Sequence, residues 1–209
     1  MEHLNRWRYC FQSILLAAFL FGGCAALKQC AYEGLSRDEW QQPERVIQSL
    51  QIRPGESIAD LGAGSGYFTF LLAQAVGPGG KVYAVDIDKD MTDLVAEKAK
   101  EHGAKNIEVI LAKPVDSLLP EGSLDLIFTS NTYHHIENRV AYFAGLRKAL
   151  RPGGRLAIIE YDRRSWITGL FKHYTPGEFI RRELEQAGYR LVREFDFLDR
   201  QSFLLFVPT

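Results

Sequence analysis

The chain has 209 residues, of which 46% are hydrophobic and 24% charged, with a formal net charge of -1 at pH 7. This length suits one domain with a sizeable core. Near-neutral charge offers no basic surface for nucleic acid, so DNA and RNA are not expected partners and a small molecule is the expected ligand.

The cysteines are confined to the first thirty residues, at Cys10, Cys24 and Cys30. The rest of the chain therefore has no thiol. This excludes a cysteine nucleophile, a zinc-cysteine site and a disulfide framework from the main body. We expect that body to hold no metal.

The N-terminal segment has the pattern of an export signal. Two arginines precede an apolar run, and two glycines stand immediately before Cys24. We therefore expect residues 1–27 to be a signal peptide or an uncleaved membrane anchor. The Leu-Phe-Gly-Gly-Cys sequence ending at Cys24 resembles a bacterial lipobox, in which this cysteine is lipidated. A buried helix of the domain is the alternative.

Residues 28–37 are expected to form a linker, and residues 38–209 a single domain. A short helix is predicted to begin near Pro43, because proline suits the first turn of a helix. An apolar strand at residues 58–61 then leads to a glycine-rich turn.

The glycine-rich turn is the most informative stretch of the chain. Gly62 can adopt a backbone conformation forbidden to other residues, Gly64 allows a ligand to approach the main chain, and Gly66 allows the next helix to pack closely. Asp60 adds an acceptor at the carboxyl end of the strand, where open α/β sheets bind ligands. Tyr67 stands where a dinucleotide fingerprint requires glycine, which disfavours a nicotinamide cofactor. A purely structural turn is the alternative.

A second apolar strand, residues 81–85, ends in Asp86, roughly 20 residues after the glycines. A carboxylate at this position suits the hydroxyls of a ribose. The alternative for Asp86 is a helix cap, a role that Asp88 or Asp90 fills equally well.

Together, the Asp-x-Gly-x-Gly-x-Gly turn and Asp86 resemble the cofactor motifs of class I S-adenosylmethionine-dependent methyltransferases. In that family the turn holds the amino-carboxypropyl part of the cofactor, the matching acid accepts the ribose hydroxyls, and the next apolar residue lies against the adenine. The resemblance implies that S-adenosylmethionine is held by Asp60, Gly62, Ala63, Gly64, Gly66, Tyr67, Asp86, Ile87 and Asn131.

The resemblance extends from about Ser36 to the C-terminus and implies an α/β, Rossmann-like methyltransferase fold. We expect a mainly parallel seven-stranded sheet with a C-terminal antiparallel hairpin and helices on both faces. The remaining helices are predicted at residues 68–76, 89–102, 139–150 and 176–187, and the remaining strands at 107–111, 124–130, 155–160, 189–197 and 202–207. Thr175 and Glu178 form a predicted capping box at the last helix, with Pro176 as its first residue.

Two positions bear on how the cofactor is enclosed. The segment from Ser36 to Glu44 resembles the lead-in of bacterial methyltransferases with this type of signal, which makes Trp40 a candidate lid. Packing of Trp40 on the edge of the domain is equally expected. Lys113 stands where the family usually places an acid beside the adenine amino group, and lysine cannot accept that hydrogen bond. The adenine would then be held by backbone groups, by Asp116, or less specifically.

The candidate catalytic residues follow the strand at 124–130, namely Tyr133, His134 and His135. Histidine titrates near neutral pH, so one of the pair is a candidate base for the methyl acceptor. Adjacent side chains usually point apart, and we select His134, with Glu160, His173 and Tyr174 as candidate partners. Tyr67 and Tyr133 are candidates to face the sulfonium, or else are packing residues.

These observations predict methyl transfer from S-adenosylmethionine to a small molecule by direct displacement. The main alternative is a non-catalytic, membrane-tethered binding or scaffold protein on the same fold, which Lys113 and the export signal favour. A nicotinamide oxidoreductase is less favoured. Export also conflicts with a cofactor made in the cytosol, so we expect membrane association without assigning the side of the membrane.

Overall fold

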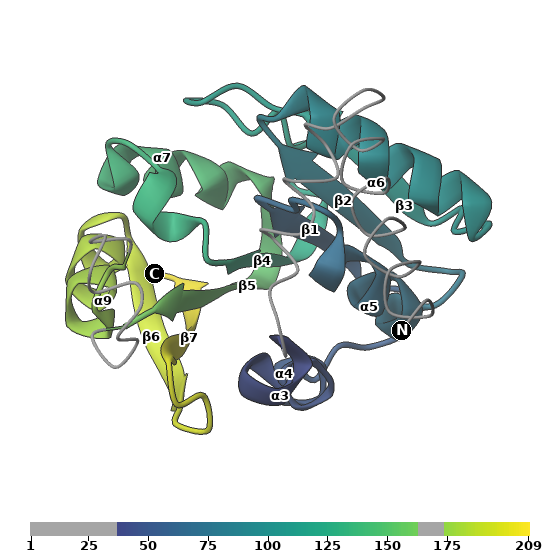
Figure 1. Ribbon diagram of the computed structural model, residues 1–209. Coiled ribbons are helices and arrows are strands. Elements are labelled where there is room, and N and C mark those ends of the chain that lie inside the picture. Colours follow the sequence, from purple (N-terminus) through teal and green to yellow (C-terminus); the bar gives the residue numbers. More distant parts are fainter. Residues whose placement is uncertain (1–36, 163–173) are drawn as a thin grey trace, which may run out of the picture. The chain divides into compact units, whose positions relative to one another are not determined.

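The computed structural model describes residues 37–162 and 174–209, all of which belong to one compact unit, Leu35–Thr209. A seven-stranded sheet organises this unit, in the order β3-β2-β1-β4-β5-β7-β6 (Figure 1). Its strands are β1 (Ser57–Leu61), β2 (Lys81–Asp86), β3 (Ile107–Leu111), β4 (Leu124–Ser130), β5 (Leu150–Tyr161), β6 (Tyr189–Phe195) and β7 (Gln201–Pro208).

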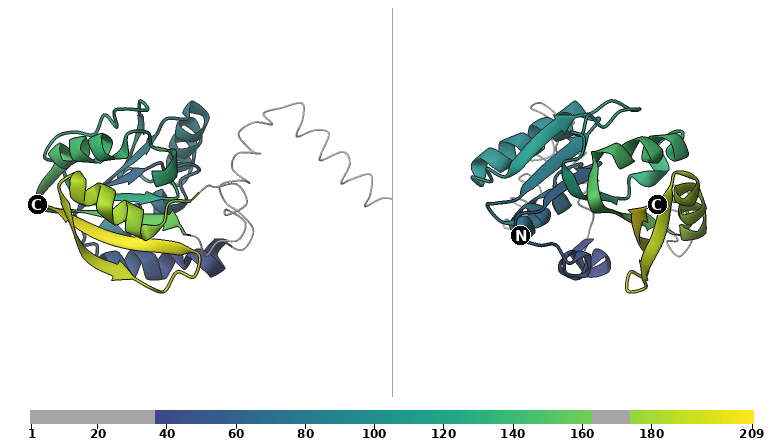
Figure 2. Two further views of the ribbon diagram at one scale, coloured as in Figure 1. Left: turned by 90° about the vertical axis from the view of Figure 1, so that its left-hand side faces the viewer. Right: turned by 180° about the vertical axis from the view of Figure 1, so that it is seen from behind.

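The first five strands are parallel to one another, whereas β7 is antiparallel to both β5 and β6. Figure 2 shows the resulting hairpin of β6 and β7, in yellow, along one edge of the sheet. The predicted fold class is confirmed. Because the parallel strands end on the same side, the loops after β1, β2 and β4 lie at one edge, where this architecture binds ligands.

Helices cover both faces of the sheet and bury a separate apolar cluster on each. The helices α4 and α5 pack on one face, where α6 lies beside α5, and α7 and α9 pack on the other. Alternating strand residues feed the two clusters: Ala59 and Leu61 face one, and Ile58 faces the other. The described helices are α3 (Arg37–Gln41), α4 (Pro43–Leu50), α5 (Tyr67–Val76), α6 (Lys89–Glu101), α7 (Arg139–Leu146) and α9 (Gly177–Gln186).

Three predicted boundaries are wrong. The helix expected to reach residue 150 gives way to a 3-10 turn at Arg147–Ala149, and β5 then begins at Leu150, because Leu150 pairs with Leu124 of β4 across a register shift. No capping box forms at α9: its N-cap is Pro176, and the Thr175 amide donates to the Tyr161 carbonyl instead.

The third boundary concerns Arg37, which the sequence places in the linker. In the structure this residue begins α3, a short helix that precedes α4. Pro43 does occupy the first turn of α4, as expected. Residues 1–27, including the lipobox-like Cys24, lie outside the described residues, and within the described part of the chain no helix is long and apolar enough to cross a membrane.

Candidate cofactor and acceptor site

The glycine turn joins β1 to α5 through left-handed backbone conformations. The φ angles of Gly62, Gly64 and Gly66 are 77°, 53° and 87°. A Cβ atom on Gly62 would lie 2.1 Å from the Oγ1 atom of Thr132, so only glycine lets the turn pack directly against the loop after β4. A Cβ atom on Gly66 would lie 2.8 Å from the ring of Phe70, which accounts for the close packing at the start of α5.

Asp86 connects the end of β2 to this turn. Its Oδ2 atom accepts the Gly64 amide at 2.8 Å, and its Oδ1 atom accepts the Asp88 amide at 2.9 Å. Each carboxylate oxygen has a second lone pair, so both can still accept a ligand hydroxyl. The capping role belongs to Asp88, the N-cap of α6, whose side chain accepts the Asp90 amide. The alternative of Asp86 as the helix cap is therefore wrong.

Asp60 is buried beneath the turn, with 3% of its surface exposed. Its carboxylate accepts the Thr69 hydroxyl of α5 at 2.6 Å. Burial raises the pKa of Asp60 to about 6, although the hydrogen bond from Thr69 opposes this effect. Asp60 thus attaches α5 to β1 through Thr69. Its carboxylate lies in a position that is shielded from solvent.

The other predicted cofactor residues are spread around the same edge. The Ala63 amide donates to the Val85 carbonyl and so ties the turn to β2. Ile87 follows Asp86 and is 61% exposed. Such exposure is expected of a side chain that lies against the adenine ring of a cofactor. Asn131 has a φ of 57°, and its side-chain oxygen accepts the Gln201 amide at 2.6 Å.

Tyr67 lies at the start of α5 and contacts the lead-in helix. Its hydroxyl donates to Asp38, and the Arg37 guanidinium lies 3.8 Å from the centre of its ring. Trp40, on the same helix, packs 5.9 Å from the ring of Tyr161. Packing on the domain, one of the two interpretations of Trp40, is thus observed, and its role as a lid stays a prediction.

Lys113 belongs to a tight turn in which its backbone pairs with that of Asp116. Asp116 accepts the Leu118 amide through Oδ1 at 3.0 Å, so part of its acceptor capacity serves its own loop. Exposed apolar side chains surround this turn, among them Leu111, Val115 and Leu118. These side chains give the loop an exposed apolar surface, while the way in which adenine is held stays a prediction.

His134 is paired with Glu160 at the end of β5. The His134 Nδ1 atom lies 3.0 Å from Glu160 Oε1, and the His134 amide donates to Oε2 at 3.1 Å. Glu160 is fully buried and also accepts the Tyr161 amide. A buried carboxylate that accepts from both the ring and the backbone fixes the orientation of the imidazole. The predicted contact with Glu160 is confirmed, whereas His173 lies outside the described residues.

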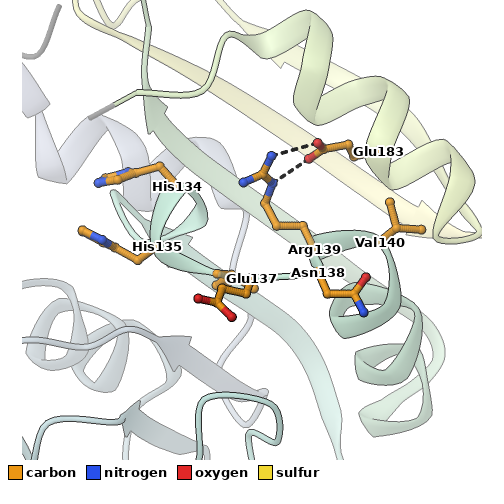
Figure 3. Close-up of a pocket in the computed structure, with 8 residues that line it drawn as sticks. His134, His135, Glu137, Asn138, Arg139, Val140 and Glu183 are labelled. Carbon is orange, nitrogen blue, oxygen red and sulfur yellow. Dashed lines mark hydrogen bonds and ion pairs between the residues drawn. The ribbon is translucent and has the colours of Figure 1, made fainter. Parts of the chain in front are cut away.

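Two expectations about this loop are wrong. The rings of His134 and His135 do not point apart: their centres are 3.9 Å from one another and both project the same way (Figure 3). The reason is that Tyr133–His135 forms a 3-10 turn, in which neighbouring side chains do not alternate as in a strand.

The second expectation concerns Tyr133, which is fully buried. Its hydroxyl donates to Glu183 at 2.7 Å, and its ring stacks on Phe143. Burial raises the pKa of Tyr133, and the neighbouring Glu183 adds to the effect. The structure therefore supports packing for this residue and does not bring its hydroxyl to the ligand edge.

A pocket of about 660 Å³ opens beside His134. His134 and His135 line one end, and Arg139, bound through two hydrogen bonds to Glu183, lines the other (Figure 3). The full lining is His134, His135, Ile136, Glu137, Asn138, Arg139, Val140 and Glu183. Among the described residues, no cluster of histidine, cysteine and acidic side chains is arranged to hold a metal ion.

Sequence reasoning missed the residues that join these parts. Thr132, Glu183 and Gln201 become important only through contacts with segments far away in the chain. Arg37 lies in a stretch that its composition alone marks as a linker. No local motif distinguishes any of these residues from ordinary surface or core positions.

The sheet order, the glycine turn and the ribose-position acid define a Rossmann-like protein that binds an adenosyl cofactor. Residues 52–188 match the model of a family described as "Methyltransferase domain". The chain belongs to this family, the class I S-adenosylmethionine-dependent methyltransferases. The predictions of cofactor and enzyme class are therefore confirmed, and the nicotinamide alternative is wrong.

Particular relatives agree with this assignment. A structure described as a SAM-dependent methyltransferase from Aquifex aeolicus has a TM-score of 0.81 and 26% identity, covering 87% of this chain and 97% of its own. Nocamycin O-methyltransferase of Saccharothrix syringae is 33% identical over 54% of this chain. Demethylmenaquinone methyltransferase of Lactococcus lactis is 33% identical over 59%. The matched part spans 41% and 48% of these two curated relatives, respectively.

The residues present fit the cofactor. Asp86 provides acceptors for two hydroxyls, and the three glycines leave the main chain of the turn without side chains at three positions. The buried Ser65 hydroxyl in the turn lacks a hydrogen-bond partner among the described residues. When bound, S-adenosylmethionine supplies an electrophilic methyl group on its sulfonium. The chain's part is to hold the cofactor and to orient an acceptor.

The raised pKa of Asp60 predicts a pH-dependent stability. The folded protein binds the Asp60 proton more tightly than the unfolded chain does, so this group stabilises fully below about pH 4, and the contribution is lost as pH rises through about 6. Asp60→Asn should abolish this loss of stability. Relative to wild type, its free energy of unfolding should therefore rise by on the order of 2 to 3 kcal/mol between pH 4.5 and pH 7.5. Urea unfolding at both pH values measures it. Asp93→Asn, an exposed control, should show no such gain, and an unchanged difference between Asp60→Asn and wild type at the two pH values would contradict the assignment.

Proposed function

We propose that the protein methylates a small molecule bound in the pocket beside His134. The observation that carries the proposal is the contact of Gly62 with Thr132, where a Cβ atom would meet the threonine at 2.1 Å. Thr132 stands two residues before His134, which lines the pocket. The glycine turn therefore contacts the same loop that supplies one end of the pocket, as expected of neighbouring cofactor and acceptor sites.

Direct displacement at a sulfonium methyl needs little covalent help from the protein. Orientation of the reacting groups supplies roughly 7 to 11 kcal/mol in favourable cases. Here the loop that would position the acceptor is held from two sides, by Thr132 against the glycine turn and by Glu160 under His134. His134 is the proposed base that removes the acceptor's proton.

The nature of the acceptor is proposed from the relatives and from the pocket. The names of the two curated relatives refer to methyl transfer to a nocamycin and to a demethylmenaquinone, both small molecules. A volume of about 660 Å³ suits an acceptor of that general size. The arsenite methyltransferase of Halobacterium salinarum is also similar, at 28% identity, but residues 38–209 contain no cysteine, so we do not propose arsenic chemistry.

The first test is calorimetric titration with S-adenosylmethionine, with NAD as the contrasting ligand. We expect binding of S-adenosylmethionine only. Asp86→Ala should weaken it by at least tenfold, because charge-assisted hydrogen bonds to hydroxyls are worth about 1.5 to 3 kcal/mol each. Asp86→Asn separates lost charge from lost backbone support, since it keeps one acceptor for the Gly64 amide, and Asp93→Ala is the surface control. Wild-type affinity in both Asp86 variants would refute the role.

The second test addresses His134. Once an acceptor is identified from a panel of phenols, amines and quinones, the rate of methyl transfer is measured against pH for wild type and His134→Gln. Loss of a general base should lower the rate by roughly a hundredfold or more and change the shape of the pH–rate profile. His135→Gln is the matched control. If His134→Gln retains both the rate and the profile of wild type, the residue has a structural role only.

We also propose that the N-terminal segment attaches the protein to a membrane. The charged start, the apolar run and the glycines before Cys24 support lipidation at that cysteine, with loss of the preceding residues. Intact-mass measurement on membrane-extracted protein from the native host should find a mature form that begins at lipidated Cys24. A main species that retains Met1 and partitions with the membrane would point to an uncleaved anchor, and one in the soluble fraction would refute both forms of attachment.

A further inference from the structure

The lead-in helix α3 places a cation against the glycine turn. The Arg37 guanidinium carbon lies 3.8 Å from the centre of the Tyr67 ring and 5.8 Å from that of Phe68. These aromatic residues are the first two of α5, directly after the glycine turn. The positive end of the α5 dipole points to the same corner, so this part of the ligand edge favours an anion.

Arg37 is held in this position from several sides. Its Nε atom donates to the Gln41 side chain, which in turn donates to Ser130 at the end of β4 at 2.9 Å. Gln41 is fully buried. On the same helix, Asp38 accepts the Tyr67 hydroxyl. The helix is therefore fastened to both β4 and α5, and the hydrogen bond to Gln41 helps to set the orientation of the guanidinium plane.

The corner also contains the opposite charge. The Asp60 carboxylate interacts electrostatically with Arg37, and both groups are desolvated: burial lowers the pKa of Arg37 and raises that of Asp60. A desolvated cation and a desolvated anion beside one ligand site suit a zwitterion. Its carboxylate would meet Arg37, and its ammonium would meet Asp60. The amino-acid end of S-adenosylmethionine is such a zwitterion.

We propose that Arg37 binds the carboxylate of the methionine end of the cofactor, as a positioning residue delivered by α3. The planar guanidinium matches a carboxylate through paired donors, which an ammonium does not. Lys98 is the other cation at the turn, but it approaches the Ser65 carbonyl at 3.3 Å and lies on α6. The inference rests on the proposed use of the glycine turn as the cofactor site.

The test compares S-adenosylmethionine with one ligand that lacks only its carboxylate and with another that lacks its whole amino-acid end. Calorimetric titration measures S-adenosylmethionine, decarboxylated S-adenosylmethionine and 5′-methylthioadenosine against the full chain. Wild type should bind S-adenosylmethionine roughly tenfold to a hundredfold more tightly than the decarboxylated form, as a charge-assisted pair predicts. Arg37→Gln should abolish this preference and leave the affinity for methylthioadenosine unchanged. Arg37→Lys should retain part of the preference, because lysine keeps the positive charge but lacks the paired donors of the guanidinium.

The control is Lys98→Gln, which removes a positive charge that lies against the Ser65 carbonyl of the glycine turn and should keep the wild-type preference. Thermal unfolding verifies that each variant is folded. If Arg37→Gln still distinguishes the two sulfonium ligands as wild type does, the inference is overturned and the cofactor site stands. If wild type binds neither S-adenosylmethionine nor methylthioadenosine, the site assignment itself falls, and the inference with it.

Discussion

The close contact of three chain segments at one edge of the sheet is the constraint on which the rest of the site depends. The glycine turn after β1 lies against Thr132 after β4, with no room for a Cβ atom on Gly62, and its Gly64 amide is bonded to Asp86 at the end of β2. A side chain on Gly62 would separate the first pair. Parallel strands bring the three segments to the same edge, and glycine lets them touch.

Two buried carboxylates lie close to this contact in the chain. Asp60 holds α5 through Thr69, and Glu160 holds the ring and backbone of His134. The side chain of a buried acid that accepts several hydrogen bonds is held in place, because any movement would leave a desolvated charge without its donors. The contact with Glu160 thereby fixes the position of the loop after β4.

The helices on the two faces of the sheet adjoin different parts of this edge. On one face, α4 and α5 pack against the sheet, and α5 begins directly after the glycine turn. On the other face, α7 and α9 pack against the sheet and supply residues that line the pocket beside His134. Glu183 of α9 accepts hydrogen bonds from Arg139 of α7 and from the buried Tyr133, so one end of the pocket is joined to the loop after β4.

The sequence by itself determined the fold class, the glycine turn and the place of Asp86, because these depend on local spacing and on the period of apolar residues. It also named Glu160 among the candidate partners of His134. Only the tertiary structure decided that Tyr133 turns inward to Glu183, fifty positions along the chain, and that Arg37 stands over Tyr67. It likewise decided that β5 begins at Leu150, through pairing with β4. Such outcomes depend on which distant side chains meet across packed elements, and the residues themselves carry no periodic or motif signal of that meeting.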